Sequence, residues 1–173
     1  MIDAGSPDLL VGEDGSALWN GRRLRCAIGR AGIVHDKREG DGGTPAGIWP
    51  MREVLYRPDR IAAPATGLPL QALTRRDGWC DDPADPAYNR RVRLPYPGHC
   101  EVLWLDAPVY DVIVPLGYND APAVPGRGSA IFLHVARADF AATAGCLALA
   151  LGDLLAVLRE AAPGAQVHLV TAA

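Results

Sequence analysis

The sequence lacks an excess of positive charge and any long apolar run. Its 173 residues contain 17 Lys and Arg against 20 Asp and Glu, which gives a formal net charge of −3. Proteins that bind nucleic acids or anionic membranes usually present a basic patch, so this balance argues against both classes. No stretch approaches the roughly 20 apolar residues of a membrane-spanning helix. We therefore predict neither a nucleic-acid partner nor a transmembrane segment.

The sequence also lacks a visible leader, internal repeats and low-complexity tracts. Its first residues, MIDAGSPDLLVGEDGS, contain neither the basic region nor the apolar region of a secretory signal peptide. No linker interrupts the chain, and its length suits one hydrophobic core. We predict a single domain over residues 1–173.

Paired cysteines are missing as well. The four cysteines, Cys26, Cys80, Cys100 and Cys146, form no CxxC pair. If one of them is a working thiol, the other three cannot all pair within the chain. This argues against a disulfide framework and leaves room for one bridge.

Glycine and proline, by contrast, are abundant, with 19 and 15 residues. This composition favours short strands joined by turns and long loops. Asn20-Gly21 separates two strand-like runs and predicts a hairpin. Further extended segments are expected at residues 47–56, 102–105, 110–116, 130–135 and 165–170. Residues 58–97 form a proline-rich insertion, which we interpret as a folded binding loop because so long a loop is usually functional or disordered.

One helix is predicted near the C-terminus. After Gly145, apolar residues recur at helical spacing, and Pro163-Gly164 ends the segment. These apolar residues are Leu147, Leu151, Leu154, Leu155 and Leu158. The sequence thus indicates a mainly β fold with one prominent helix that begins at Cys146.

Cys146 and His134 form a candidate catalytic pair. A cysteine attacks as its thiolate, and a nearby imidazole or the positive end of a helix lowers the thiol pKa. The sequence places Cys146 at the first turn of the expected helix and His134 on a strand twelve residues earlier. Gly145 would let the backbone approach a substrate, with N–H groups there forming an oxyanion hole.

Two other interpretations of Cys146 stay open. A cysteine before an apolar helix is often a packed small hydrophobic residue. Zinc ligation by His134, Cys146 and the His99-Cys100 pair is disfavoured because no pair has metal-ligand spacing. We therefore predict no metal and no other cofactor.

The motifs around these residues resemble the YkuD-type L,D-transpeptidase catalytic domain. That family has a TPxG segment on an early strand, a histidine-bearing strand, and a Gly-Cys turn opening a helix. The matching residues are Thr44-Pro45-Ala46-Gly47, His134 and Thr143-Ala144-Gly145-Cys146, and the resemblance covers about Leu24 to Val170. It implies a β-sandwich or barrel-like fold with long loops. It also implies that Cys146 is the nucleophile, that His134 is the base oriented by the Val135 carbonyl, and that Gly145 belongs to the oxyanion hole.

The chain departs from the family pattern at three points. Ala144 stands where most members have a second histidine, Ala148 stands where they have arginine, and the His–Cys gap is short. The arginine helps shape the substrate pocket, so its loss puts donor recognition in question. Arg127 and Arg137 are candidates to replace it, although each could be an ordinary solvated arginine.

The resemblance implies peptidoglycan stem peptides as donor and acceptor. The thiolate would form a thioester with one stem, and an amine of a second stem would resolve it, giving 3-3 or, in a divergent member, 1-3 links. It further implies a location in the periplasm or on the cell-wall side, and inhibition by carbapenems. Hydrolysis of the thioester, as in an L,D-carboxypeptidase or endopeptidase, and a non-catalytic wall-binding module are the alternatives.

Aromatic and polar loop residues are the candidates for the substrate groove. Trp79 and Tyr88 could instead pack within their loop, and the GYND segment at residues 117–120 could be a turn. The candidate residues are Trp79, Tyr88, Asn89, Tyr118, Asn119 and Ser129.

Overall fold

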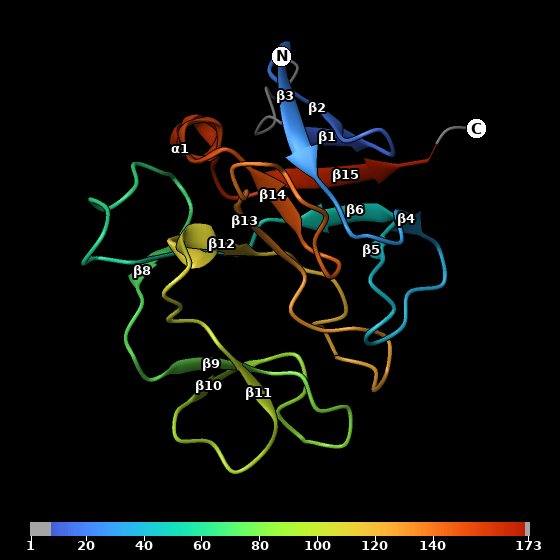
Figure 1. The fold of residues 1–173 in the computed structure, drawn as a ribbon, viewed down its shortest axis with the longest axis vertical. Coiled ribbons are helices and arrows are strands. Elements are labelled where there is room, and N and C mark those ends of the chain that lie inside the picture. Colours follow the sequence, from blue (N-terminus) through green and yellow to red (C-terminus); the bar gives the residue numbers. More distant parts are fainter. Residues whose placement is uncertain (1–7, 172–173) are drawn as a thin grey trace.

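A computed structural model describes residues 8–171, and these residues form a mainly β fold (Figure 1). A curled ten-stranded sheet makes up most of the molecule. In spatial order its strands are β6 (Gly47–Pro50), β15 (Gln166–Val170), β1 (Leu9–Gly12), β2 (Ser16–Trp19), β3 (Arg22–Ala27), β14 (Leu147–Leu149), β13 (Phe132–Val135), β12 (Val112–Pro115), β7 (Val54–Tyr56) and β8 (Leu70–Ala72).

Within residues 8–171, two smaller sheets and two helices complete the fold. A three-stranded sheet lies below the large one in Figure 1. The smaller elements are β9 (Asp77–Cys80), β10 (Arg91–Arg93), β11 (Cys100–Val102), β4 (Ile33–Val34), β5 (Thr44–Pro45), the 3₁₀ helix η1 (Pro108–Tyr110) and α1 (Leu151–Glu160). The insertion expected at residues 58–97 is folded, because it supplies β8, β9 and β10.

The predicted hairpin is confirmed. Trp19 pairs with Arg22, and the two residues between them have φ angles of 48° at Asn20 and 75° at Gly21. Both values lie in the left-handed region that a two-residue hairpin turn requires, where Asn and Gly are favoured. Alternate residues of β2 are buried, so Ala17 and Trp19 enter the core.

Two extended segments differ from the expectation. Residues 47–56 form two strands in place of one. The first, β6, pairs with β15, and the second, β7, pairs with β12. The strand expected at residues 102–105 ends at Val102. Beyond it, the Trp104 ring packs under the Arg57 guanidinium, with 3.8 Å between the guanidinium carbon and the ring centroid.

The prediction that the helix begins at Cys146 is wrong. Leu147–Leu149 form strand β14, which lies between β13 and β3 and is buried on both faces, and α1 begins only at Leu151. A strand buried on both faces is a continuous apolar run, which periodicity alone cannot separate from a buried helix. The later leucines do follow a helical stripe, because Leu154, Val157 and Leu158 face the core.

The core has two parts. The larger part lies between the curled sheet and α1, where Trp19, Leu154 and Leu158 are fully buried. The smaller part joins the large sheet to the three-stranded one, where the Trp79 ring meets the edge of Phe132 at 5.0 Å between centroids. Within residues 8–171, no helix is both long and apolar enough to cross a membrane.

Gly29 provides a test of how tightly the backbone is packed beside β5. A Cβ at Gly29 would lie 2.3 Å from the Gly42 carbonyl oxygen, whereas a Cβ at Gly152 in α1 would meet nothing within 4 Å. We expect Gly29→Ala to lower the free energy of unfolding by about 2 kcal/mol or more. Gly152→Ala, the control, should raise it by about 0.5 kcal/mol because alanine favours helix. Urea denaturation measures both, and equal stabilities would contradict the packing.

Candidate active site

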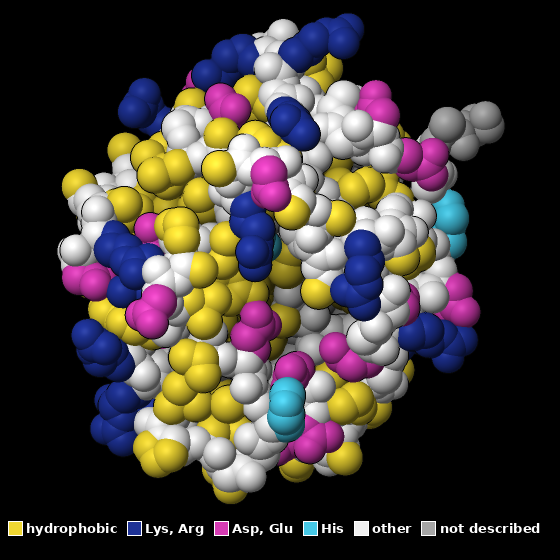
Figure 2. All heavy atoms as spheres, viewed as in Figure 1, with side chains coloured by type: hydrophobic (Ala, Val, Ile, Leu, Met, Phe, Trp, Pro, Cys, Tyr) yellow, Lys and Arg dark blue, Asp and Glu magenta, His cyan; other side chains and the backbone are white. Residues whose placement is uncertain are grey.

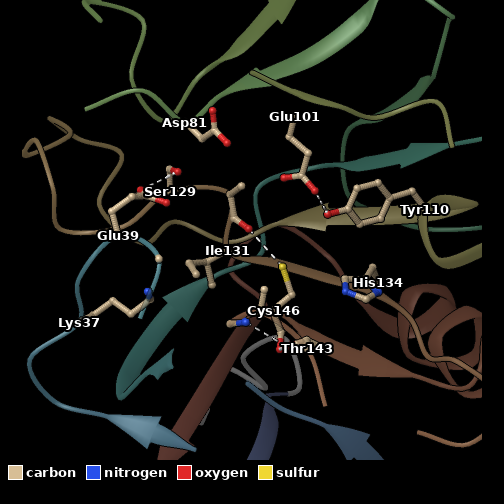
Figure 3. A pocket seen from close by; sticks show the side chains of 14 residues that line it. Lys37, Glu39, Asp81, Glu101, Tyr110, Ser129, Ile131, His134, Thr143 and Cys146 are labelled. Carbon is tan, nitrogen blue, oxygen red and sulfur yellow. Dashed lines mark hydrogen bonds between the residues drawn. The ribbon is translucent and has the colours of Figure 1, made fainter. Parts of the chain in front are cut away.

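Cys146 lies between a tight turn and strand β14, with its sulfur in a cavity (Figure 3). The Sγ donates to the Ala130 carbonyl at 3.1 Å and accepts the Phe132 N–H at 3.4 Å. Burial, reinforced by the negative charge of Glu101, raises the pKa of the Cys146 thiol to about 12. The expectation of a thiol ionised by a helix terminus is therefore wrong: α1 begins five residues further on, and the resting thiol is neutral.

His134 lines the same cavity from the middle of β13. Its Nδ1 lies 3.0 Å from the Val135 carbonyl oxygen, which can only accept, so Nδ1 carries the proton and Nε2 keeps a free electron pair. This is the orientation that the resemblance implied. Burial lowers the pKa of His134, so the ring is neutral near pH 7. Tyr110 packs edge-on against it, with 5.4 Å between the ring centroids.

The turn that presents Cys146 is held by a threonine hydroxyl. Thr143 Oγ1 donates to the Cys146 carbonyl at 2.6 Å and accepts the Gly145 N–H at 3.1 Å. Gly145 has a φ of 141°, and a Cβ there would lie 2.8 Å from the Gly43 carbonyl oxygen, so only glycine fits. Because the Gly145 N–H is already bonded to Thr143, its oxyanion-hole role stays a prediction.

The TPxG segment supports this turn from behind. Thr44 is fully buried, and its Oγ1 accepts the Gly29 N–H at 2.8 Å. Gly29 in turn forms a bridge to Thr143, with flanking hydrogen bonds from Arg30 N to Thr143 O and from Thr143 N to Ile28 O. Residues 28–30, which follow β3, thus connect the TPxG motif to the Cys146 turn. This gives the motif a structural role that the sequence alone did not explain.

Two cavities meet at His134. The first, about 240 Å³, contains Cys146, and the second, about 260 Å³, contains Arg137 and Ala148. Glu101 and Tyr110 line both. Figure 2 shows a hollow near the middle of this face, with acidic side chains along its lower rim.

Three carboxylates line the first cavity, and sequence reasoning missed all of them. Asp81 directly follows β9 and Glu101 is the middle residue of β11, both above the sulfur in Figure 3, and Glu39 comes from the loop before β5. The Tyr110 hydroxyl donates to Glu101, and burial raises the pKa of that carboxyl. These residues lie on separate segments of the chain and carry no local motif, so no pattern in the sequence brings them together.

Lys37 is the cation of this cavity, and it too was missed. Its side chain is 5% exposed, and its Nζ donates to Asp41 Oδ1 and to the Arg38 carbonyl, each at 2.6 Å. Its charge favours the Cys146 thiolate, but less than burial opposes it.

Only two of the expected substrate residues line the two cavities. Ser129 lines the first, where its hydroxyl donates to Glu39 Oε2 at 2.8 Å. Arg137 lines the second together with Ala148, the position where most relatives carry arginine. Arg127 is exposed and lines neither. Contact of Ser129 and Arg137 with substrate stays a prediction.

The other expected groove residues hold the cavity wall. Asn89 Oδ1 accepts from Trp79 Nε1 and from the Ala130 N–H, each at 3.0 Å, and its Nδ2 donates to the carbonyls of Tyr118 and Asn119. Asn89 thereby fixes the carbonyl-bearing residue Ala130 beside the thiol.

Tyr88 and Asn119 bind the neighbouring loop in the same way. The Tyr88 hydroxyl donates to Glu39 and accepts the Gly128 N–H, and Asn119 Nδ2 donates to the Gly128 carbonyl at 2.9 Å. The structure thus places these residues behind the cavity, and their direct contact with a substrate stays a prediction.

The four cysteines are free, and within residues 8–171 no group of three or more His, Cys, Asp or Glu side chains is arranged to hold a metal ion. His99 of the zinc alternative bonds instead to Asp81, with 2.5 Å between Nδ1 and Oδ1.

The raised pKa of Cys146 predicts its alkylation behaviour. Because only the thiolate reacts, the rate of iodoacetamide addition to Cys146 should rise about tenfold per pH unit between pH 7 and 10. Mass spectrometry of the Cys146 peptide measures this rate, and urea-denatured protein, whose thiols titrate near pH 8.5, is the control. A rate that levels off at or below pH 8 in the folded protein would show a stabilised thiolate instead.

The sequence matches the model of one known protein family. The model of the YkuD family, the L,D-transpeptidase catalytic domain, matches residues 1–169. No curated protein shows significant similarity to the chain.

Solved structures of L,D-transpeptidases are among its structural neighbours. L,D-transpeptidase 1 of Mycobacterium tuberculosis is 11% identical, with a TM-score of 0.44 over 97% of this chain and 62% of that one. The helical cell shape determining protein Pgp2 of Campylobacter jejuni is 13% identical, with a TM-score of 0.48 over 99% and 49%. This chain spans less than two thirds of the length of either protein. By its match to the family model over nearly its whole length, the chain belongs to the YkuD family of L,D-transpeptidase catalytic domains.

Proposed function

We propose that this protein is a peptidoglycan L,D-transpeptidase that works through a thioester on Cys146. The observation that carries the proposal is that the Cys146 thiol and His134 line the same cavity. The His134 imidazole is neutral, and its Nε2 has a free electron pair that can accept a proton. Family membership supports a cell-wall substrate.

In the first half-reaction, Cys146 Sγ attacks an amide carbonyl of the donor stem peptide. Because burial keeps the resting thiol neutral, its proton must leave as the bond forms, and His134 Nε2 accepts it. The imidazolium then protonates the departing amine as the C–N bond breaks. The products are a thioester and a free amine, and His134 is neutral again.

In the second half-reaction, an amine of the acceptor stem peptide attacks the thioester. His134 Nε2 takes a proton from this amine, the C–S bond breaks, and the proton returns to the Cys146 sulfur. The two cavities suit a reaction of two substrates, because His134, Glu101 and Tyr110 line both of them. We assign the donor and the acceptor to separate cavities.

We further propose that Arg137 replaces the arginine that Ala148 lacks. Arg137 lines the same cavity as Ala148, and its guanidinium could bind a carboxylate of the stem peptide. The chain would act in the periplasm or on the cell-wall side, where this substrate is found, and would form 3-3 or 1-3 links. A carbapenem should acylate Cys146, since a mycobacterial neighbour has been solved in complex with imipenem.

Cys146 and His134 can be tested on isolated sacculi. We expect Cys146→Ala to reduce the formation of cross-linked muropeptide dimers by at least about 10³-fold because it removes the nucleophile. His134→Gln should reduce it by about 10²- to 10⁴-fold because it removes the base. Liquid chromatography of the muropeptides measures both, and Cys100→Ser is the matched cysteine control.

The same chromatograms separate the alternatives. New dimers establish transfer, and their linkage identifies the amide bond that is cleaved. Shortened monomers without dimers would establish hydrolysis in place of transfer. Activity that survives in Cys146→Ala would refute the thioester mechanism, and binding to sacculi without any product would leave a wall-binding module.

Arg137→Ala tests recognition separately from the chemistry. We expect kcat/KM for the donor to fall about tenfold or more, because the substitution removes one charge-assisted hydrogen bond to the substrate. Arg127→Ala tests the other candidate and should have a smaller effect, and Arg159→Ala on the exposed face of α1 controls for the loss of charge. Steady-state kinetics that show equal values for Arg137→Ala and Arg159→Ala would remove Arg137 from the donor site.

A further inference from the structure

Two free cysteines outside the catalytic cavity lie directly opposite each other. Cys80 is the last residue of β9, Cys100 is the first residue of β11, and the antiparallel register pairs them. Directly opposed residues of antiparallel strands project from the same face of the sheet. The two thiols are therefore neighbours, although their positions in the sequence show no pairing motif.

The hydrogen bonds identify which kind of pair this is. The N–H of Cys80 donates to Arg90 O and its C=O accepts from Asn89 N, each at 2.9 Å, so both groups face the segment that leads into β10 and not β11. Hydrogen bonds to the β11 side are made instead by the odd-numbered residues of β9. Asp77 is one of them, because its carbonyl accepts the Leu103 N–H. Cys80 and Cys100 are thus a non-hydrogen-bonded pair, in which the Cα atoms approach to about 4.5 Å and the side chains are closest.

This spacing meets the requirement of a disulfide, whose Cα atoms lie about 4.4–6.8 Å apart. Tyr96 lies in the loop between β10 and β11, and its hydroxyl donates to Asp85 Oδ1 at 2.9 Å. The hydrogen bond to Asp85 is the main cause that raises the pKa of Tyr96 to about 12, and electrostatic interactions with Cys80 and Cys100 add to it.

We propose that Cys80 and Cys100 are a dithiol site that forms an intramolecular disulfide when a disulfide-bearing oxidant is present. Cys100 is half-buried and meets the oxidant first, whereas Cys80 is fully buried. The Cys100 thiolate attacks one sulfur of the oxidant and releases one thiol, leaving a mixed disulfide. Cys80 then attacks the Cys100 sulfur and releases the second thiol. The protein loses two protons and two electrons, and the oxidant becomes two thiols.

The cross-link would act on the wall of the catalytic cavity. Asp81 and Glu101, each directly after one of these cysteines, line the cavity that contains Cys146. Adjacent residues in a strand point to opposite faces, so the two thiols point away from the Glu101 face of the sheet, and Glu101 bonds to Tyr110. A disulfide would therefore fix the spacing of β9 and β11, and of the two carboxylates, without consuming the Cys146 thiol.

Oxidised glutathione is the probe for this site. We expect the purified, reduced protein to lose two hydrogens in mass and a digest without reductant to contain the Cys80 and Cys100 peptides joined together. The thermal midpoint should rise on the order of 5 °C because the cross-link restricts the unfolded chain, and dithiothreitol should reverse the rise. None of these measurements depends on transpeptidase activity.

Three variants make the outcome decisive. Cys146→Ala should form the same cross-link, whereas Cys80→Ala should stop at a glutathione adduct on Cys100 with no such rise in thermal midpoint. Cys100→Ser should form neither the cross-link nor the glutathione adduct at residues 80 and 100. Because residue 100 is half-buried, this variant keeps the test valid if Cys80→Ala fails to fold. A wild-type protein that stops at the Cys100 adduct, or that links Cys146 instead, would overturn the proposal.

Discussion

The parallel pairing of β13 with β14 in the middle of the large sheet is the constraint on which the site depends. It sets His134 opposite Ala148 and leaves Cys146 immediately before the neighbouring strand, so two residues twelve positions apart reach one cavity. Both strands are entirely buried, which makes the register costly to shift, because a slip of one residue would exchange the two faces of the strand. The two residues that we propose as base and nucleophile are thereby held by strands of the core.

Desolvation within the cavity has an electrostatic consequence. It raises the pKa of the Cys146 thiol and lowers that of the His134 imidazole, so both groups are neutral at rest. The two groups therefore form no ion pair at rest, and in the proposed mechanism the proton moves as the thiol attacks the substrate. Lys37 is the buried cation near the sulfur, and its attraction does not outweigh the desolvation of a thiolate. The proposed mechanism therefore relies on the substrate and His134 together to activate the thiol.

The polar residues around the cavity divide into those that line it and those that hold its wall. Asn89 illustrates the second group, since its amide bonds to four other groups and fixes the Ala130 segment next to the sulfur. The sequence marked Asn89 as a groove residue because polar side chains in long loops often bind ligands. A residue type in a loop does not reveal whether its hydrogen bonds are satisfied within the protein, and here they are. Glu101 went unnoticed for the opposite reason, because a single acidic residue near a strand resembles any solvated one.

The sequence by itself determined the mainly β character, the Asn20-Gly21 hairpin, and the association of Cys146, His134 and the TPxG segment with one family. These features rest on local backbone preferences and on short motifs, which are written in neighbouring residues. Only the tertiary structure decided that Leu147–Leu149 form a strand, because an apolar run of three residues takes its conformation from the strands on either side. It also decided the neutral state of the thiol, the carboxylates around it and the opposition of Cys80 and Cys100, since burial, charge proximity and strand register arise between segments that are distant in the chain.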